Sequence, residues 1–413
     1  MLLENDLFPE DVRVRDETHT LLAAGYDVRV IAPRGAGQGR RERVEGVEVE
    51  RYWLPMAKSD GIPGLLAEYV VAHAQLFIRG FGSLLGGTDI LHSHNPPDTL
   101  FPLAIAARRL RRQFVFDQHD LFPALFEQRF GRGPLWRIAD FANRMMIRNA
   151  DIVLVTNGTH LEWARRLAPR PDTQVVLVRN GPRRSAVAGR ISPIRPGALA
   201  DPRLLYVGAL EPQDGVAQLP EMLERLATHH GMAGAQLTVA GWGSELEALR
   251  SDFAARGLLG RVSLLGRTQH ADVLRLIRDS DICLDPAPCS PFNHCTTMVK
   301  ISEYLGLGRP AVAYALHETA KTAAGAASLV PCGDLDAFVG RVAELSRSED
   351  ARAALQRRAQ ARAPELVWEH QAANLLRAYG SLSGLRRRGS GRCSPTAPAR
   401  PPAPDRSVAA RLR

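Results

Sequence analysis

The pattern of apolar and polar positions alternates between two periods along the chain. Short apolar runs of the kind that form buried strands lie at residues 26–33, 46–55, 88–94, 113–120, 150–157 and 173–181. Between them, apolar residues recur at helical spacing, most clearly at residues 14–24, 62–85, 102–112, 135–149 and 160–167. This alternation predicts a series of β-α-β units and therefore a parallel sheet with helices on both faces.

A second series of the same kind follows a segment without periodicity. Residues 186–201 are rich in Pro, Gly and Ala and form the best linker candidate. Strand-like runs then follow at residues 203–210, 235–243, 261–267, 280–287 and 309–316. We therefore predict an α/β protein with two Rossmann-like, doubly wound parallel-sheet domains facing a cleft. Ligands are expected at the carboxyl ends of the strands.

These patterns set the expected boundaries. We expect an N-terminal domain at residues 1–183, a linker at 184–201, a C-terminal domain at 202–366, a closing helix at 367–383 and a disordered basic tail at 384–413. Leu2 and Leu3 resemble the end of a strand that lacks its beginning, so the first strand is expected to be truncated. Residues 34–43 are expected to form a basic loop.

Length and charge narrow the class of protein. A chain of 413 residues, 45% of them apolar, is long enough for two cores. The formal net charge of +9 suits an anionic small ligand or a contact with an anionic membrane surface, and it is weak evidence for nucleic acid. No run of 18 apolar residues predicts a transmembrane helix, and the acidic N-terminus is unlike a signal peptide. A cytoplasmic protein is expected.

The cysteines indicate neither a disulfide framework nor a metal site. There are five of them, an odd number, and none forms a Cys-x-x-Cys pair. Cys289, His294 and Cys295 lie close in sequence, but no second pair of ligands accompanies them. We therefore expect reduced thiols and no metal ion.

One short segment carries a lysine and a glutamate on the same helix. In residues 296–314, the apolar residues Met298, Ile301 and Leu305 line one face of a helix, while Lys300 and Glu303 lie three residues apart on another. The two could form a surface ion pair worth about 0.2–0.5 kcal/mol. Alternatively, they could bind a ligand, with the ammonium meeting a phosphate and the carboxylate meeting sugar hydroxyls.

An ordered series of motifs resembles family 4 glycosyltransferases, which have the GT-B fold. The second half carries LLYVGALEPQDGVAQL, LTVAGWGSELEAL, VSLLGR and SDICLDPAPCSPFNHCTTMVKISEYLGLGRPAVAY. The first half carries HSHNPPD, FDQHD and ADIVLVTNG in the order found in that family. The resemblance implies a retaining, hexosyltransferase-type transfer of a sugar from a nucleotide diphosphate donor, with no metal ion or other cofactor.

The resemblance also implies a donor site in the second half. Lys300 and the backbone N–H groups near Thr296 and Thr297 are expected to meet the diphosphate, and Lys300 is placed among the catalytic residues. Glu303 is expected to accept hydrogen bonds from the ribose hydroxyls. The remaining expected donor-site residues follow strands and are Gly208, Gly241 and Arg267.

Residues of the first half are expected to complete the reaction centre and the acceptor side. His119 follows a strand and matches a family histidine near the reacting centre, and Asp120 is preferred over Asp117 as its catalytic neighbour. His94, Asn95, Asp98 and Arg13 are expected on the acceptor side. Residues 95–98 could equally form a rigid turn, and Arg13 could be a surface arginine.

Several positions depart from the family pattern. Ala209 and Asp214 stand where many relatives carry an arginine and a lysine that bind the diphosphate, and Cys295 stands where the first of two glutamates is common. The resemblance nevertheless implies a transferase for a lipid-linked or polysaccharide glycan in cell-surface polysaccharide synthesis. A nucleotide-sugar 2-epimerase, or a non-catalytic protein that binds a nucleotide sugar, remains the alternative.

Overall fold

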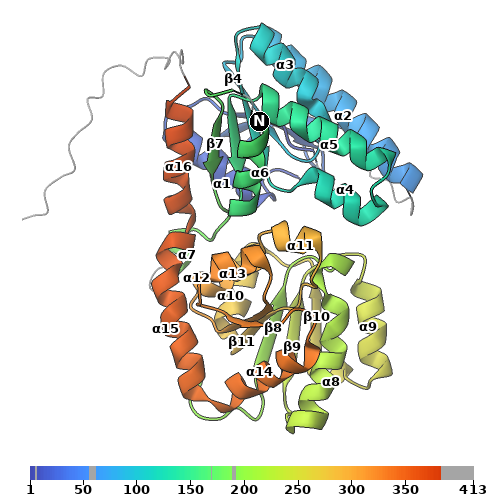
Figure 1. Ribbon diagram of the computed structural model, residues 1–413, viewed down its shortest axis with the longest axis vertical. Helices are drawn as coiled ribbons and strands as arrows, with labels where there is room; N and C mark the ends of the chain where they lie inside the picture. Colours follow the sequence, from blue (N-terminus) through green and yellow to red (C-terminus); the bar gives the residue numbers. More distant parts are fainter. Residues whose placement is uncertain (5–6, 55–61, 169, 188–191, 383–413) are drawn as a thin grey trace, which may run out of the picture. The chain divides into compact units, whose positions relative to one another are not determined.

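The computed structural model describes residues 1–4, 7–54, 62–168, 170–187 and 192–382, without the side chains of residues 62–68 and 129. The expected tail, with Cys393, and part of the expected linker lie outside these residues. Residues Met1–Leu382 form one compact unit, which contains two parallel-sheet α/β halves (Figure 1). The predicted fold class is confirmed.

The N-terminal half is built on two groups of strands. β1 (Arg29–Pro33) pairs in parallel with β3 (Val47–Tyr52), while β4 (Ile90–His94), β5 (Gln113–Gln118), β6 (Ile152–Val155) and β7 (Gln174–Leu177) form a parallel series. Leu2 forms single parallel bridges to Ile31 of β1 and Ser93 of β4. One bridged residue thus occupies the place between the two groups where a full first strand would lie.

The prediction that residues 34–43 form a basic loop is wrong at the C-terminal end of that segment. β2 (Arg41–Val44) pairs with β3 as an antiparallel hairpin. The turn between them is formed by Glu45 and Gly46, both of which have positive φ, 51° and 85°. Such turns match the twist of two adjacent strands and allow a tight hairpin.

Helices cover both faces of the N-terminal strands. They are α1 (Val12–Ala23), α2 (Ile62–Leu85), α3 (Phe101–Arg109), α4 (Phe122–Phe130), α5 (Pro134–Asn149) and α6 (Gly158–Leu167). α1 begins after Asp11, whose side chain accepts a hydrogen bond from the backbone N–H of Val14. Among the described residues, no helix combines the length and the apolar character needed to cross a bilayer.

The C-terminal half has one six-stranded parallel sheet. Its spatial order is β10 (Val262–Gly266), β9 (Gln236–Ala240), β8 (Arg203–Val207), β11 (Ile282–Asp285), β12 (Ala311–Tyr314) and β13 (Ser328–Val330). Numbered along the chain, this order reads 3-2-1-4-5-6, so the strand order reverses between β8 and β11. Ligands of such sheets bind at the carboxyl ends of the strands near this point.

Seven helices connect and flank these strands. They are α8 (Leu219–His230), α9 (Leu246–Ala255), α10 (His270–Asp279), α11 (Pro291–Cys295), α12 (Val299–Gly306), α13 (His317–Ala323) and α14 (Leu335–Arg347). Apolar side chains on both faces of the sheet pack beneath them. The four-residue helix α7 (Arg184–Val187) lies in the segment between the halves.

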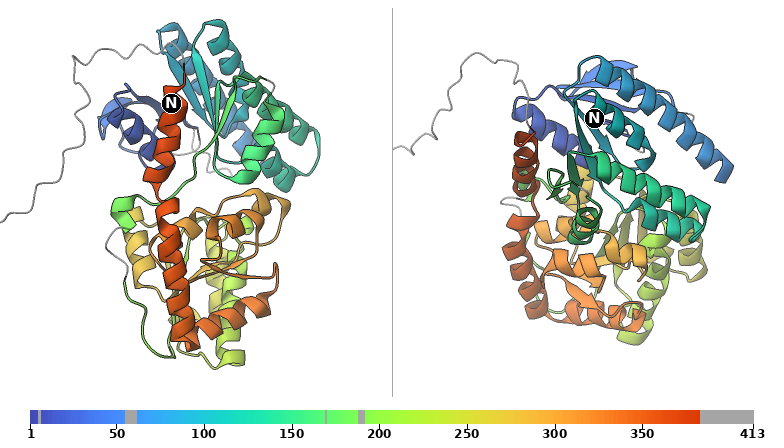
Figure 2. Two further views of the ribbon diagram at one scale, coloured as in Figure 1. Left: turned by 60° about the vertical axis from the view of Figure 1, so that its left-hand side comes forward. Right: turned by 45° about the horizontal axis from the view of Figure 1, so that its top comes forward.

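The chain returns to its N-terminal half through its last two helices. α15 (Glu349–Leu366) packs against α12, whereas α16 (Trp368–Gly380) packs against α1 and β7 (Figure 2). The indole N–H of Trp368 donates to the Thr20 hydroxyl at 2.9 Å, and the Tyr379 hydroxyl lies 2.7 Å from Nδ1 of His92. The segment predicted to form a closing helix, residues 367–383, is thus helical from Trp368 to Gly380.

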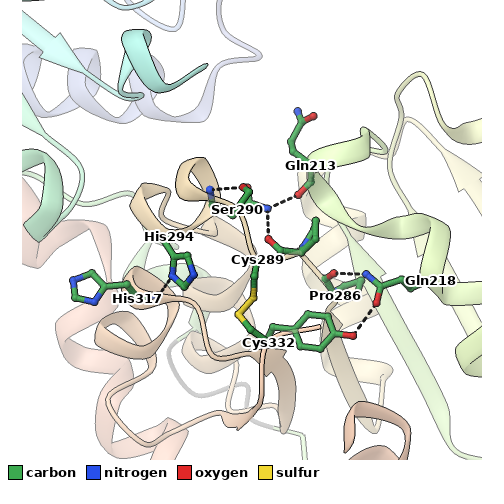
Figure 3. Close-up of a disulfide and its surroundings, with 11 residues drawn as sticks. Gln213, Gln218, Pro286, Cys289, Ser290, His294, His317 and Cys332 are labelled. Carbon is green, nitrogen blue, oxygen red and sulfur yellow. Dashed lines mark hydrogen bonds between the residues drawn. A yellow bond between two sulfur atoms is a disulfide. The ribbon is translucent and has the colours of Figure 1, made fainter. Parts of the chain in front are cut away.

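The expectation that all cysteines are reduced thiols is wrong for one pair. Cys289 and Cys332 form a disulfide (Figure 3), with their Cα atoms 5.7 Å apart. Cys283 and Cys295 are free. The bond joins the loop after β11 to the segment after β13. The two cysteines are 43 residues apart in sequence, so only the return of both loops to the same edge of the sheet reveals the pair.

Candidate functional site

Two loops at the carboxyl edge of the C-terminal sheet approach each other at glycines. A Cβ atom on Gly241 would lie only 1.9 Å from the carbonyl oxygen of Gly208. Gly208 itself has a φ of 139°, and a Cβ there would lie 2.9 Å from Cε of Lys300. The structure therefore brings together three of the residues predicted to bind the donor.

Lys300 is buried within a group of anions and hydroxyls. Its side chain is only 7% exposed, and Nζ lies 3.1 Å from the Tyr206 hydroxyl, 3.2 Å from Asp214 and 3.4 Å from Asp285. Burial by itself would lower the pKa of Lys300, but Tyr206, Asp285 and Asp214 outweigh it and raise this pKa well above its ordinary value. Burial also raises the pKa of Asp285. The ammonium is therefore charged and already paired.

The N-terminus of α12 beside Lys300 has no side-chain cap. Met298 occupies the N-cap position and makes no side-chain capping bond. The Thr296 hydroxyl donates to the Phe292 carbonyl at 3.0 Å, whereas the buried Thr297 hydroxyl has no hydrogen-bond partner in the described part of the chain. The first N–H groups of the helix are thus suited to an anion.

Glu303 pairs with a histidine that the sequence did not single out. Its carboxylate lies 2.8 Å from Nε2 of His270, the first residue of α10. Lys300 and Glu303 each have a different partner, so the alternative of a surface ion pair between them is wrong. A donor ribose that bonded to Glu303 would therefore also meet His270.

Arg267 lies on the surface beside an open hollow. Its guanidinium is 3.0 Å from the Glu10 carboxylate and 5.1 Å from the centre of the exposed Trp242 ring. The hollow has a volume of about 600 Å³ and is lined by Leu265, Arg267, Thr268, Gln269, Asp272, Arg275, Leu276 and Asp279. Arg267 is thus placed to contact a ligand at the rim of this hollow. Gly208 and Lys300 are not among the residues that line the hollow.

In the N-terminal half, Asp117 at the end of β5 is the centre of a buried polar network. Arg13 donates to both carboxylate oxygens at 2.7 and 2.8 Å, while ring nitrogens of His94 and His119 lie 3.0 and 2.8 Å away. Burial by itself would raise the pKa of Asp117, but Arg13 and His119 outweigh it and hold this pKa well below its ordinary value. Asp117 is therefore ionised.

Three further ionisable side chains, those of Glu17, His92 and His94, are buried around this ion pair. Burial, with a contribution from Asp117, raises the pKa of Glu17 well above its ordinary value. Burial also lowers the pKa of His92 and of His94. Arg13 thus bonds to both oxygens of Asp117 and also lies 3.2 Å from Glu17, while Asp117 orients the His119 imidazole at the end of the strand.

The other residues expected on the acceptor side organise the backbone. The Asn95 side-chain oxygen accepts from the backbone N–H of His119 at 2.5 Å, and its amide donates to the Asp120 carbonyl at 2.8 Å. Asp98 is fully buried and accepts a hydrogen bond from Asn143 at 2.8 Å. Asn95 thus joins the ends of β4 and β5, and the contacts of Asp98 lie inside the domain.

The burial of Asp98 makes a pH-dependent stability prediction. Burial raises its pKa to about 7, above the value of about 3.9 expected in an unfolded chain. Protonated Asp98 therefore stabilises the fold below about pH 4, and this contribution is lost as the pH rises through about 7. We expect Asp98→Asn to gain up to about 4 kcal/mol relative to wild type across this range. Denaturant unfolding of both proteins measures this, and a constant difference would contradict it.

Two clusters among the described residues bring three or more possible metal ligands within 4.8 Å of one another. In the first, Cys289, His294 and Cys332, the two sulfurs are bonded to each other. In the second, formed by Glu17, His92, His94 and Asp117, Arg13 occupies both oxygens of Asp117. The rings of His92 and His94 are stacked, 4.3 Å apart, and their Nε2 atoms lie 3.7 and 4.0 Å from the Glu17 carboxylate. Neither cluster resembles a formed zinc site, and a reaction without a metal stays a prediction.

Sequence reasoning missed several residues that the structure places at these sites. It preferred Asp120, whereas the network centres on Asp117. Asp117 lies in β5, one residue before this strand ends at Gln118. It also missed Tyr206, Asp285 and His270. Asp285 ends β11 at the carboxyl edge next to the point where the strand order reverses, which was the available signal.

Comparisons with known proteins agree with this architecture. Residues 11–181 match the family model of the glycosyl transferase 4-like domain, and residues 201–348 match that of glycosyl transferases group 1. Glycogen synthase from Mycobacterium tuberculosis (strain ATCC 25618 / H37Rv) is 26% identical over 235 residues, which are 55% of this chain and 53% of that protein. The chain thus spans about half the length of the curated relatives it matches.

Solved structures share the fold over nearly the whole described chain. Sucrose-phosphate synthase from Thermosynechococcus elongatus is 19% identical, with a TM-score of 0.67 over 92% of this chain and 98% of that one. Anabaena HepE in complex with UDP-glucose is 16% identical, with a TM-score of 0.67 over 92% and 99%. At these identities the likeness shows the fold. The two family models, which together match most of the chain, show that it belongs to the family 4-like glycosyltransferases, and the solved structures share its GT-B fold.

Proposed function

We propose that the protein is a retaining hexosyltransferase that moves a sugar from a nucleotide diphosphate donor to a glycan acceptor. The bond between the anomeric carbon and the diphosphate oxygen breaks, and the acceptor oxygen bonds to that carbon on the same face. The proton of the acceptor hydroxyl passes to the departing phosphate oxygen. The reaction requires stabilisation of the leaving diphosphate and no metal ion or other cofactor.

The observation that carries this proposal is the position of Lys300. It lies in the first turn of an uncapped helix, against Gly208, at the point where the strand order reverses. A cation and free backbone N–H groups in that place suit a diphosphate. Since Asp214 lies 3.2 Å from the ammonium, bound diphosphate would compete with this carboxylate. Glu303, beside His270, would hold the ribose hydroxyls.

His119 and the Arg13–Asp117 pair would complete the reaction centre from the N-terminal half. The imidazole of His119 contacts Asp117 through Nε2, which fixes its orientation. Because the ionised carboxylate only accepts hydrogen bonds, Nε2 carries a proton, and Nδ1 of the neutral imidazole can accept a hydrogen bond from a hydroxyl of the transferred sugar. Asp120, His94, Asn95 and Asp98 remain candidates for the catalytic and acceptor sides, acting directly or by holding the loops in place.

The acceptor that we propose is a lipid-linked or polysaccharide glycan in cell-surface polysaccharide synthesis, at the cytoplasmic face of the membrane. Peripheral contact is supported by large apolar side chains exposed on α2 and α5, among them Ile78, Leu85, Ile138 and Phe141. Exposed arginines at positions 108, 109 and 111 adjoin the end of α3 and suit anionic lipid. The HepE structure with UDP-glucose supports a nucleotide-sugar donor.

Nucleotide binding to a Glu303 variant tests the donor site. We would titrate wild type and Glu303→Ala with UDP, GDP, dTDP and ADP by calorimetry. Loss of a carboxylate that accepts two ribose hydroxyls should weaken binding by about 10–100-fold. The matched control is Glu247→Ala, because Glu247 is 81% exposed on α9. Equal affinity of all three proteins would contradict the assigned site.

Product analysis then separates the proposed function from its alternatives. Release of nucleotide diphosphate that depends on a glycan acceptor, with the anomeric configuration preserved in the product, supports retaining transfer. Conversion of the donor to a free isomer without an acceptor would favour the 2-epimerase. Tight donor binding without turnover would favour a protein that only binds the nucleotide sugar.

A further inference from the structure

A second hollow in the N-terminal half is lined by six residues, of which four are arginines. It has a volume of about 270 Å³ and lies among β1, β3, α2 and the loop before β2. Its lining residues are Arg34, Arg40, Arg51, Trp53, Gln75 and Arg79. None of them belongs to the donor site or to the Asp117 network. No carboxylate is among them.

The nearby acidic residues neutralise only part of this charge. Glu42 accepts from Nε of Arg51 at 2.7 Å, and Glu50 lies 3.3 Å from Arg79. Glu50 is also shared with Arg41, at 3.3 Å. Four arginines line the hollow and a fifth adjoins it, against two carboxylates, so a net positive charge remains.

Arg51 is built into the wall of the hollow and has a free donor. Its side chain is 1% exposed. Nε donates to Glu42 and one terminal nitrogen donates to the Phe8 carbonyl at 2.8 Å. The other terminal nitrogen, Nη1, is buried without a hydrogen-bond partner among the residues that the structure describes. A buried, unpaired guanidinium N–H is unfavourable, and an anion in the hollow would satisfy it.

The hollow also has an apolar face and a limited size. Trp53 is 64% exposed, so its indole offers a flat surface at the edge of the arginines. Drug-sized ligands and cofactors typically occupy about 300–1,000 Å³, so a complete nucleotide sugar is too large for this space. A phosphate group with the adjoining part of a sugar or lipid is of suitable size.

We infer that this hollow binds the phosphate or diphosphate group of a phosphorylated acceptor, with the carbon part next to it packed on Trp53. Several guanidinium groups match the three oxygens and double charge of a phosphate ligand better than they match a ligand with a single carboxylate. The inference rests on the proposed function, because it names the class of acceptor for the proposed transfer. Sugar phosphates and lipid phosphates share this chemistry.

Direct binding to the full chain tests the inference and separates the two sources. We would titrate it with glucose 6-phosphate, with inorganic pyrophosphate, and with phosphatidylcholine vesicles that contain phosphatidic acid. Arg40→Gln and Arg79→Gln are the test variants. Arg43→Gln is the matched control, because Arg43 is exposed on β2 and outside the hollow. Arg51 is left intact because its buried bonds support the fold.

We expect each test variant to weaken binding by about tenfold or more and the control to leave it nearly unchanged. Binding of glucose 6-phosphate would identify a sugar phosphate, and binding of the vesicles alone would identify a lipid phosphate. Equal weakening by Arg43→Gln would show general charge attraction and overturn the inference. The same holds if no probe binds.

A nucleotide titration of the same proteins distinguishes failure of this inference from failure of the proposed function. If the phosphate probes do not bind but a nucleotide binds and depends on Glu303, only the inference fails. If the phosphate probes bind the arginines and no nucleotide binds, the hollow is an anion site and the proposed transfer fails, together with the assignment of the ligand as its acceptor.

Discussion

Replacing Lys300 by Met should lower kcat/KM for sugar transfer by about 10²–10³-fold, the loss typical when one preorganised group that stabilises developing charge is removed. Within the described part of the chain, the Lys300 ammonium is the only cation within 3.5 Å of the Asp214 and Asp285 carboxylates. Methionine retains most of the apolar length of lysine, so the main change is loss of charge. Steady-state kinetics with the donor identified by calorimetry measures the effect.

The same substitution should also destabilise the fold, which calls for a control. Removing one partner of a buried ion pair costs about 3–5 kcal/mol, because the remaining charge is left uncompensated. The double variant Lys300→Met with Asp214→Asn should recover part of this stability without recovering activity. Recovered activity in the double variant would show that Lys300 serves only to neutralise Asp214. Asp214→Asn alone should bind nucleotide diphosphates more tightly, because the ammonium loses a competing anion.

Replacing Arg13 by Met should lower the free energy of unfolding by about 3–5 kcal/mol. The guanidinium donates to both oxygens of Asp117 and also to the Val178 carbonyl and the Asn180 side chain, at 2.8 and 2.7 Å. It therefore joins α1 to the ends of β5 and β7. Denaturant unfolding at neutral pH measures the loss. Arg29→Met is the control, because its ion pair with Glu48 is exposed and should contribute less than about 1 kcal/mol.

The pH dependence of that loss tests its electrostatic origin. In wild type the pKa of Asp117 is held well below 3.8, so the stability from its ionised form is present above about pH 4 and is lost as the pH falls through the lowered value. Without Arg13, burial should raise this pKa, and protonation should relieve the variant as the pH falls. The deficit should therefore shrink between about pH 7 and pH 4. A deficit that does not change with pH would indicate lost packing instead.

Parts of the site that depend on local pattern could be predicted from sequence. The helix at residues 62–85 lies where the apolar spacing placed it, and α12 with Lys300 in its first turn follows from the spacing of Ile301 and Leu305. Gly208 and Gly241 were placed after strands, where loops gather at the carboxyl edge of the C-terminal sheet. Each of these features depends on residues that are close to one another in the sequence.

Features that depend on distant residues were not predictable from pattern. Asp214 and Asp285 meet Lys300 only because the loops after β8 and β11 lie next to each other in the sheet. The Cys289–Cys332 disulfide and the Glu303–His270 pair arise in the same way. Asp117 and Asp120 are both acidic residues near the end of one strand, and only the position of Arg13 distinguishes them.

The sequence by itself determined the two α/β halves, most of their strands and the family, because periodicity and motif order are local properties. The short strands β2 and β13 were not predicted. The tertiary structure decided which charges are paired, which are free and where arginines from three separate segments line one hollow. The physical reason is that burial and the distances between charges set their energies, and both depend on which segments the fold brings together.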